Sequence, residues 1–277
     1  MGSDVYPRRV GPVRPGPGGT VPPMDLGIAG RRAAVAASSS GLGLGVARAL
    51  VAEGVQVALC GRTRAKVEEA ASTLSNPDGP DVLVVPLVAD VSTADGATGF
   101  VEAAIDALGG VDILVANAGG PPAGTFASTP YDAYLPALQL NLLSTVAMCR
   151  AAVPAMAERG WGRVVGITSS SVRQPSATLI LSNTARAGVT AFLKTLATEV
   201  AGAGVTVNTV QPGLHATPRL AELYGDRIEQ AAAAVPAGHL GDPDDFGAAV
   251  AFLCSEHARF LTGASVPIDG GATGSLQ

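Results

Sequence analysis

The chain has 277 residues, of which 47% are hydrophobic and 15% are charged, and its formal net charge at pH 7 is −5. This composition predicts one globular domain with a core large enough to fold without disulfides or bound metal. The acidic balance, without a basic stripe, argues against nucleic acid as the main partner. No apolar run reaches the roughly 20 residues that a membrane span needs, so we expect no membrane partner.

The three cysteines are few and widely scattered: Cys60, Cys149 and Cys254. They have neither the density of a disulfide framework nor the spacing of a metal site, so no metal is predicted and a reducing, cytoplasmic location is expected. Each one lies in an apolar segment, which predicts a small core residue.

Residues 1–23 differ from the rest because six prolines punctuate Gly, Arg and Val there. That density excludes helix and central strand and predicts a disordered tail. Arg8-Arg9 lacks the apolar region that a twin-arginine signal requires. We favour Met24 as the natural start of the protein and predict one domain over residues 24–277.

From Arg31 onward, short runs rich in Val, Ala and Leu alternate with longer helical patterns. The runs are apolar at almost every position, as in parallel strands that are covered on both faces. Helix starts are indicated at Ser92, Thr129-Pro130 and Asp242-Pro243. The alternation predicts an α/β, Rossmann-type doubly wound fold with a seven-stranded parallel sheet. Its strands are expected at 33–37, 55–60, 82–89, 111–116, 162–168, 205–211 and 265–268.

The segment 37–43 lies between the first strand and the first helix and reads Ala-Ser-Ser-Ser-Gly-Leu-Gly. Glycine lets the backbone approach a pyrophosphate, and a helix N-terminus supplies free N–H groups and the positive end of a dipole. A dinucleotide site is therefore predicted here, with contacts from Ala37, Ser39, Ser40, Gly41, Leu42 and Gly43.

The second strand ends at Gly61-Arg62, where an NAD-preferring enzyme usually has an acid that binds the ribose 2′-hydroxyl. Gly61 removes that acid, and the guanidinium of Arg62 can pair with a 2′-phosphate. NADP(H) is therefore favoured over NAD(H). The alternative is that Arg62 is only a solvated surface residue.

Further motifs follow in order: Asp90-Val91 after the third strand, Asn117-Ala118-Gly119 after the fourth, and Pro212-Gly213 with Thr217 after the sixth. With segment 37–43 they make the chain resemble the short-chain dehydrogenase/reductase family over residues 33–271. The resemblance implies that Asp90 and Val91 contact the adenine ring, and that Asn117 links strands. It also implies that the Ala118-Gly119 backbone meets the cofactor, and that Pro212, Gly213 and Thr217 touch the nicotinamide carboxamide.

The chain departs from the family motifs at Ala37, where the first glycine is expected, and at Ala116, where an asparagine is expected. An alanine at position 37 is tolerated if its φ is negative and is strained if its φ is positive.

The family's catalytic set is an Asn, a Ser, a Tyr and a Lys. Asn141 matches the first, which serves a proton relay through a helix carbonyl and a water, and Ser169 matches the second, which hydrogen-bonds the substrate oxygen. The tyrosine is expected thirteen residues after Ser169, where Ser182 stands, and the lysine position holds Arg186.

These two replacements change the proton chemistry. A phenol has a pKa of ~10, which a nearby Lys⁺ lowers further, whereas a serine hydroxyl is a far weaker acid. Arg186 keeps the positive charge and can bind ribose hydroxyls, but it does not give up a proton. Lys194 is no substitute, because eight residues of helix rise about 12 Å. We therefore expect cofactor anchoring to survive and the usual proton transfer to be lost.

Other groups could supply the proton or bind the substrate. His215 titrates near neutrality and is a candidate acid, the alternative being a solvated loop histidine. Tyr224 lies in the segment expected to form a substrate lid, 214–238, and would reach inward or pack. Arg173 would bind an anionic substrate or face water. The leucines of the lid favour an apolar ligand.

The chain is similar to a subgroup that resembles 3-oxoacyl carrier-protein reductases and carries Ser-Asn-x-x-Arg in place of Tyr-x-x-x-Lys. This similarity implies an NADP(H)-dependent oxidoreductase acting on a 3-oxoacyl compound or a similar ketone. The alternatives are a non-redox enzyme (a cyclase, dehydratase or isomerase) and a dinucleotide-sensing protein, and fold alone cannot choose among them. By the same resemblance, the helices around 131–158 and 183–203 imply a homotetramer or homodimer.

Overall fold

The computed structural model describes residues 24–74 and 82–276, so the tail predicted at 1–23 lies outside the described residues. Its centre is a sheet of seven parallel strands in the order β3-β2-β1-β4-β5-β6-β7. The strands are β1 (Arg32–Val35), β2 (Gln56–Gly61), β3 (Val84–Val88), β4 (Ile113–Ala116), β5 (Gly162–Ile167), β6 (Val205–Pro212) and β7 (Ser265–Ile268).

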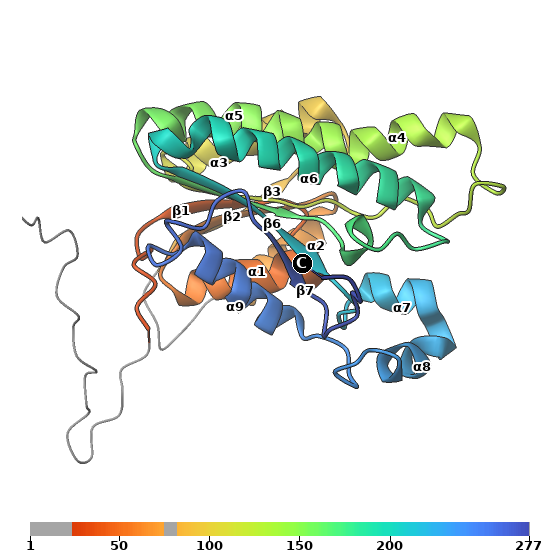
Figure 1. The fold of residues 1–277 in the computed structure, drawn as a ribbon. Coiled ribbons are helices and arrows are strands. Elements are labelled where there is room, and N and C mark those ends of the chain that lie inside the picture. The colour runs from red at the N-terminus through yellow and green to blue at the C-terminus, as the bar shows by residue number, and fades with distance from the viewer. Residues whose placement is uncertain (1–23, 75–81, 277) are drawn as a thin grey trace, which may run out of the picture.

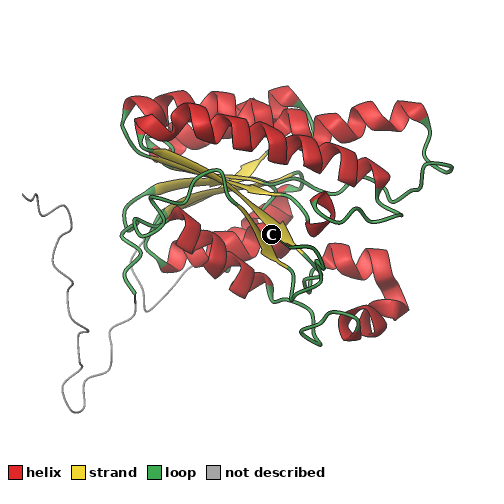
Figure 2. Ribbon diagram, viewed as in Figure 1, coloured by secondary structure: helices red, strands yellow, loops and turns green. Residues whose placement is uncertain are grey.

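Helices cover both faces of the sheet (Figures 1 and 2). On one face lie α3 (Ala94–Leu108), α4 (Tyr134–Leu138), α5 (Ser144–Glu158) and α6 (Ile180–Val200). On the other lie α1 (Gly41–Ala52), α2 (Arg64–Ser72) and α9 (Pro243–Cys254). The strand order reverses between β1 and β4, which is the switch point where such a fold opens a binding crevice.

Each helical layer packs on its own core of small and branched apolar side chains. One core joins the strands to α3, α5 and α6, and the other joins them to α1, α2 and α9. The three cysteines are buried, and burial raises the pKa of each thiol to about 12. The prediction that they are small core residues is confirmed.

All seven predicted strands are present, each within two residues of the expected bounds. Asp242 caps α9, because its side chain accepts a hydrogen bond from the Asp244 N–H, as predicted. The start predicted at Ser92 is wrong by one residue. Thr93 is the cap of α3, and its hydroxyl accepts from the Gly96 N–H, whereas the Ser92 N–H donates to Asp90.

The helical run Tyr131–Glu158 is long and, on average, apolar. It joins η1 (Tyr131–Ala133), α4, the π-helical turn η2 (Gln139–Leu143) and α5. By length and composition alone it could cross a membrane, with a mean hydropathy of 1.3 and 44% of the apolar window buried. Polar residues such as Asn141 and Arg150 interrupt the run, so no uninterrupted apolar stretch marks it in the sequence. Here α5 packs against α3 and β4, as a core helix does.

Two polar clusters lie at the amino ends of the strands. In the first, the guanidinium groups of Arg31 and Arg163 lie 3.7 and 4.2 Å from the centre of the Trp161 ring. The Trp161 Nε1–H donates to Glu256 at 2.7 Å, and Glu256 also pairs with both arginines. The starts of β1 and β5 are thereby joined to the segment after α9.

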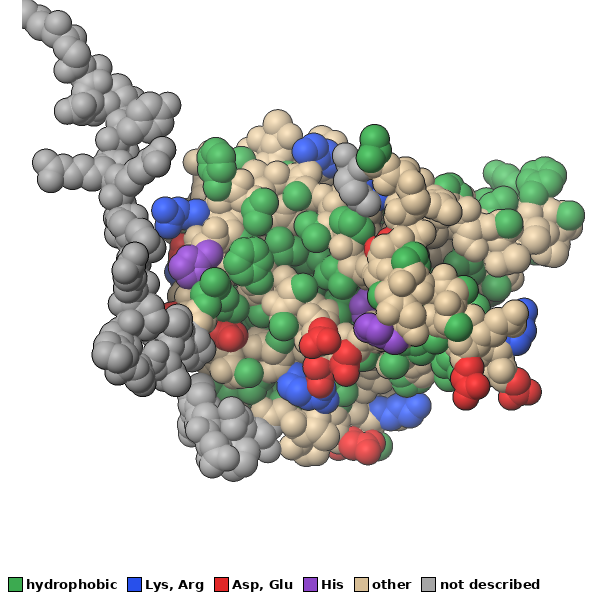
Figure 3. All heavy atoms as spheres, turned by 60° about the horizontal axis from the view of Figure 1, so that its bottom comes forward, with side chains coloured by type: hydrophobic (Ala, Val, Ile, Leu, Met, Phe, Trp, Pro, Cys, Tyr) green, Lys and Arg blue, Asp and Glu red, His purple; other side chains and the backbone are tan. Residues whose placement is uncertain are grey.

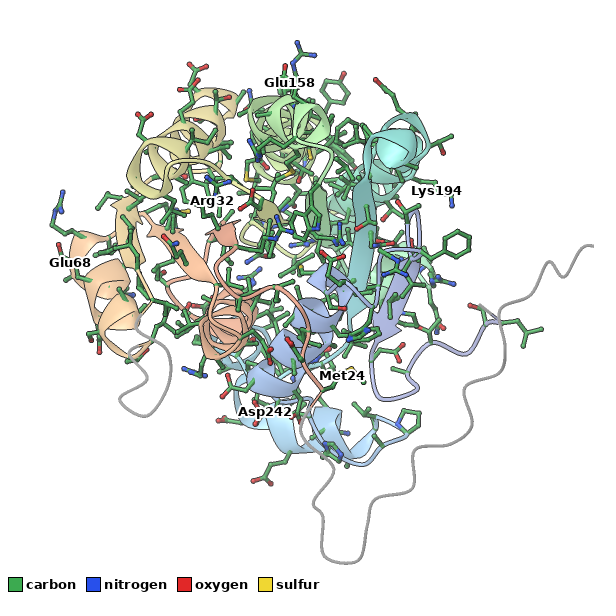
Figure 4. The ribbon with its side chains drawn as sticks, turned by 90° about the vertical axis from the view of Figure 1, so that its left-hand side faces the viewer. Met24, Arg32, Glu68, Glu158, Lys194 and Asp242 are labelled. Carbon is green, nitrogen blue, oxygen red and sulfur yellow. The ribbon has the colours of Figure 1, made fainter. Side chains whose placement is uncertain are left out.

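In the second cluster, the buried carboxylate of Asp112 accepts hydrogen bonds from Arg32 Nε at 2.8 Å and Nη2 at 2.7 Å, and from Arg159 Nη2 at 3.3 Å. Figure 4 views the molecule from this side and labels Arg32. Burial alone would raise the pKa of Asp112, but the Arg32 hydrogen bonds and the charges of both arginines outweigh it and hold this pKa below its usual value.

Candidate active site

A pocket of about 700 Å³ lies at the carboxyl ends of the strands, against the helix α7 (Pro218–Tyr224). The next helix, α8 (Ile228–Ala233), lies beside α7 in Figure 1. Its wall combines the start of α1, the segments after β4, β5 and β6, the first turns of α6, and α7. Of the predicted site residues, Ser40, Gly41, Leu42, Asn117, Ala118, Gly119, Ser169, Ser182, Arg186, Pro212, Gly213, His215, Thr217 and Tyr224 line it.

The loop between β1 and α1 is tightly folded. A Cβ at Gly43 would lie 2.6 Å from the Ala37 carbonyl oxygen, so only glycine fits there. Ala37 has φ +47°, in the left-handed region that normally requires glycine. Of the two possibilities raised by the sequence, the positive φ is therefore observed, and the backbone is strained at this residue. Its carbonyl accepts from Asn117 Nδ2 at 3.2 Å, which links the loop to the end of β4.

The start of α1 fits the diphosphate of a dinucleotide. The side chain of the cap residue Ser40 makes no hydrogen bond to the helix, so the first-turn N–H groups of α1 are left for a ligand. Ser40, Gly41 and Leu42 all line the pocket wall.

Packing at the end of β2 explains in part why the residue at position 61 is glycine. A Cβ at this position would lie 2.8 Å from Ser39 Oγ, so the absence of an acid also makes room for Ser39. Arg62 follows on the exposed surface. Asp90 and the buried Val91 follow the neighbouring strand β3. These residues, together with Ala37, Ser39 and Gly43, lie outside the pocket lining.

Asn141 lies behind the pocket wall rather than on it. Its Nδ2 donates to the Gly119 carbonyl at 2.9 Å, and its Oδ1 is buried with no hydrogen-bond partner in the described part of the chain. Its backbone carbonyl, which the resemblance assigned to a proton relay, accepts a hydrogen bond from the Thr145 hydroxyl at 2.8 Å. Asn141 therefore supports the Gly119 segment from within the π-helical turn.

Two serine hydroxyls lie on the wall. Ser169 Oγ accepts from the Ser171 N–H at 3.1 Å, so its own hydrogen is free to donate to a ligand. Ser182 is 8% exposed on the first turn of α6, and its hydroxyl bonds to none of the described residues. Both hydroxyls can donate to a carbonyl oxygen.

Arg186 is held by backbone carbonyls. Nη1 donates to Ile167 and Thr168, both at 2.8 Å, and Nη2 donates to Ala118 at 3.4 Å. No carboxylate of the described residues pairs with it, and burial, aided by the positive charge of Arg219, lowers its pKa to about 10. Of the five guanidinium N–H groups, two are left for a ligand.

Lys194 does not replace the missing lysine. Its Nζ donates to the Gly263 carbonyl at 2.8 Å, and the residue lies at the rim of the molecule in Figure 4.

His215 is 5% exposed, so the alternative of a solvated loop histidine is wrong. Its Nδ1 lies 3.3 Å from the Gly213 carbonyl and its ring packs edge-on against Phe246. Burial lowers the pKa of His215, which favours the neutral ring at pH 7. A neutral ring whose Nδ1–H donates to the Gly213 carbonyl lacks the extra proton that a histidine gives up as a general acid.

The prediction that Arg173 binds substrate is corrected. Its Nε donates to Gln211 Oε1 at 2.6 Å and its Nη2 to the Ser265 carbonyl at 2.8 Å, so the guanidinium ties β6 to β7 and does not line the pocket.

Comparison with known proteins decides the family. The model for the enoyl-(acyl carrier protein) reductase family matches residues 36–273. Dehydrogenase/reductase SDR family member 4 of Bos taurus is 33% identical over 92% of this chain and 90% of that protein. D-beta-hydroxybutyrate dehydrogenase of Cupriavidus necator is 34% identical over 87% of this chain and 97% of that protein. The chain belongs to the short-chain dehydrogenase/reductase family.

Solved structures of this family share the fold. L-sorbose reductase from Gluconobacter frateurii, complexed with NADPH and L-sorbose, superimposes with a TM-score of 0.84 at 32% identity. The superposition covers 91% of this chain and 100% of the L-sorbose reductase chain. The chain is therefore a member of an oxidoreductase family, with Ser182 and Arg186 at the pocket wall.

Two arginines of the wall were not predicted from the sequence. Arg219 on α7 and Arg227 at the end of η5 (Gly225–Arg227) line the pocket. The lid was expected from its leucines to be apolar. The basic residues within segment 214–238 were the only signal in the sequence for these two arginines. The direction in which their side chains point depends on how α7 and α8 pack against the rest of the domain.

Proposed function

We propose that the protein is an NADP(H)-dependent oxidoreductase that interconverts a carbonyl compound and an alcohol, with a 3-oxoacyl compound or a similar ketone as substrate. The observation that carries this proposal is one wall that joins the first turn of α1, the Asn117–Gly119 segment and the Pro212–Thr217 loop to the hydroxyls of Ser169 and Ser182. The NADPH complex of L-sorbose reductase supports the cofactor class.

The preference for NADP(H) rests on the end of β2. Ser39 packs on Gly61, and Arg62 follows on the same edge of the sheet without an acid beside it in the sequence. A hydroxyl and a guanidinium there suit a 2′-phosphate, which is doubly charged and accepts several hydrogen bonds.

When bound, a nicotinamide dinucleotide supplies or accepts the hydride. The residues of this chain act on the oxygen. The Ser169 and Ser182 hydroxyls would hold the substrate carbonyl oxygen by hydrogen bonds, and the Arg186 cation would stabilise negative charge on that oxygen. The proton reaches that oxygen from pocket water through the Ser182 hydroxyl, since Ser182 cannot act as a phenol does.

The first test is a titration of the pure protein with NADPH and with NADH, followed by nicotinamide fluorescence. We expect NADPH to bind at least about tenfold tighter, and Arg62→Gln to remove most of that difference, because a charge-assisted pair contributes roughly one decade or more of affinity. Arg64→Gln, two residues further on, is the matched control, because Arg64 pairs with Glu68 on the surface. Absence of binding of either dinucleotide at millimolar concentration contradicts the proposal.

A non-redox reaction on the same scaffold is the second candidate. It is favoured by Arg186, which is held by backbone carbonyls, and by the buried neutral His215, because neither is a strong proton donor. Product formation from a candidate substrate without consumption of NADPH supports this candidate, whereas one-to-one consumption supports the oxidoreductase.

We also propose a cytoplasmic homotetramer or homodimer that binds neither nucleic acid nor membrane. Acidic and basic side chains are interspersed on the face shown in Figure 3 and form no basic stripe there. A monomeric mass by light scattering contradicts the assembly, and retention on DNA or on vesicles contradicts the predicted absence of those partners.

A further inference from the structure

The described pocket wall carries charge of one sign only. Its charged side chains are Arg186, Arg219 and Arg227, and no Asp, Glu or Lys lines it. Like charges in a partly buried site repel each other unless an anion compensates them. A pocket with this lining favours a negatively charged ligand.

Arg219 is aimed at the pocket from the lid. Its Nη2 donates to the Pro121 carbonyl at 3.1 Å, and a Cβ at Gly120 would lie 3.4 Å from its Nε, so the guanidinium spans from α7 to the segment after β4. Glu222 contacts its Nη1 at 3.3 Å, but this carboxylate is two-thirds exposed and does not line the pocket. The charge of Arg219 toward the pocket is therefore only partly neutralised.

The other two arginines have no acidic partner among the described residues. Arg186 donates to neutral carbonyls, and the nearby charge of Arg219 adds to burial in lowering its pKa. Arg227 makes no hydrogen bond or ion pair with the described residues, although it lines the same pocket. The guanidinium groups of Arg219 and Arg227, the two arginines of the lid, thus remain available to a ligand in this pocket.

The anion could belong to the dinucleotide or to the substrate. The diphosphate has its own binding element in the first turn of α1. Arg219 and Arg227 lie instead on the lid beside Leu220, Leu223 and Tyr224, an apolar and aromatic surface that suits a hydrocarbon chain. We infer that the substrate is an aliphatic oxo acid whose carboxylate is bound by Arg219 and Arg227, an assignment that rests on the proposed function and names its substrate class.

The test uses hexanoate and its uncharged analogue hexanamide as probes, titrated calorimetrically with and without saturating NADPH. The wild type should bind hexanoate at least about tenfold tighter than hexanamide. Arg219→Gln and Arg227→Gln should each weaken hexanoate severalfold to about tenfold and leave hexanamide unchanged. Arg259→Gln, which removes the same charge from an exposed position outside the pocket, should change neither.

Equal binding of hexanoate and hexanamide to the wild type overturns the inference. So does a loss of NADPH affinity in Arg219→Gln and Arg227→Gln with hexanoate binding unchanged, because the arginines then serve the cofactor diphosphate. Because Arg227 makes no hydrogen bond or ion pair with the described residues, Arg227→Gln keeps the test valid if Arg219→Gln loses the lid structure. The hexanoate titration without NADPH requires neither the cofactor nor turnover. A failure of the proposed cofactor role is therefore detected separately, by the NADPH titration.

Discussion

Replacing Asp112 by asparagine isolates the contribution of one buried carboxylate. The carboxylate accepts two hydrogen bonds from the Arg32 guanidinium, a third from the Arg32 backbone N–H and a fourth from Arg159. Asparagine keeps the shape but loses the charge and one acceptor oxygen, so both guanidinium groups lose their counter-ion. Removing one partner of a fully buried ion pair costs about 3–5 kcal/mol.

Solvent reduces that cost here. The side chains of Arg32 and Arg159 are 24% and 38% exposed, and that of Asp112 is 6% exposed. We therefore expect Asp112→Asn to lower the free energy of unfolding by about 2–3 kcal/mol at pH 7, with part of each arginine charge screened by water. For a domain of this size the melting temperature should fall by roughly 5–10 °C.

The pH dependence gives an independent check. The pKa of Asp112 is lowered in the folded state, so its stabilisation is present above the ordinary aspartate pKa of ~3.9 and is lost as pH falls through the folded-state value. The gap between wild type and Asp112→Asn should therefore close in acid. Urea denaturation followed by circular dichroism measures it.

Glu68→Gln is the matched control. Glu68 and Arg64 form a pair on α2 with side chains 53% and 74% exposed. Such a pair contributes only about 0.3–0.5 kcal/mol. The reasoning is refuted if Asp112→Asn is no more destabilising than Glu68→Gln, or if its effect is the same at pH 7 and below pH 4.

Three further predictions concern the site. Ser182→Tyr with Arg186→Lys should raise kcat/KM for a 3-oxo ester about 10²–10⁴-fold by restoring a general acid, and no gain in an NADPH-binding variant would argue against hydride transfer. Because burial lowers the pKa of His215, the unfolded chain takes that proton first, so stability should fall as pH drops below about 6.5 and His215→Gln should flatten that slope in urea titrations. Ala37→Gly should raise the free energy of unfolding by up to about 1 kcal/mol, since relief of a positive φ exceeds the added freedom of the unfolded chain; a lower urea midpoint would contradict this.

The sheet could be predicted from the sequence because each strand is marked by residues within the strand itself. Seven apolar runs and the glycine loop mark the strands and the first crossover, and a parallel sheet brings their carboxyl ends together. Ser169 and Ser182 were placed by spacing, and both reach the same wall.

Where prediction failed, the deciding contacts come from distant parts of the chain. Arg173 is taken by Gln211 and Ser265, and His215 is buried against Phe246. Arg219 reaches the pocket only because α7 folds back onto Pro121. No residue near any of these in sequence signals the partner, so their directions follow from the packed structure alone.

The Trp161 cluster at the amino ends of the strands has a consequence for how such a protein changes over time. It fastens β1, β5 and the end of α9 to one another on the side of the sheet opposite the pocket. Replacements at the pocket wall, including those at positions 182 and 186 on α6, leave these contacts at the amino ends unchanged. The contacts that join these elements at the amino ends can therefore persist while the reacting groups at the carboxyl ends are exchanged, so new chemistry can be tried on the same frame.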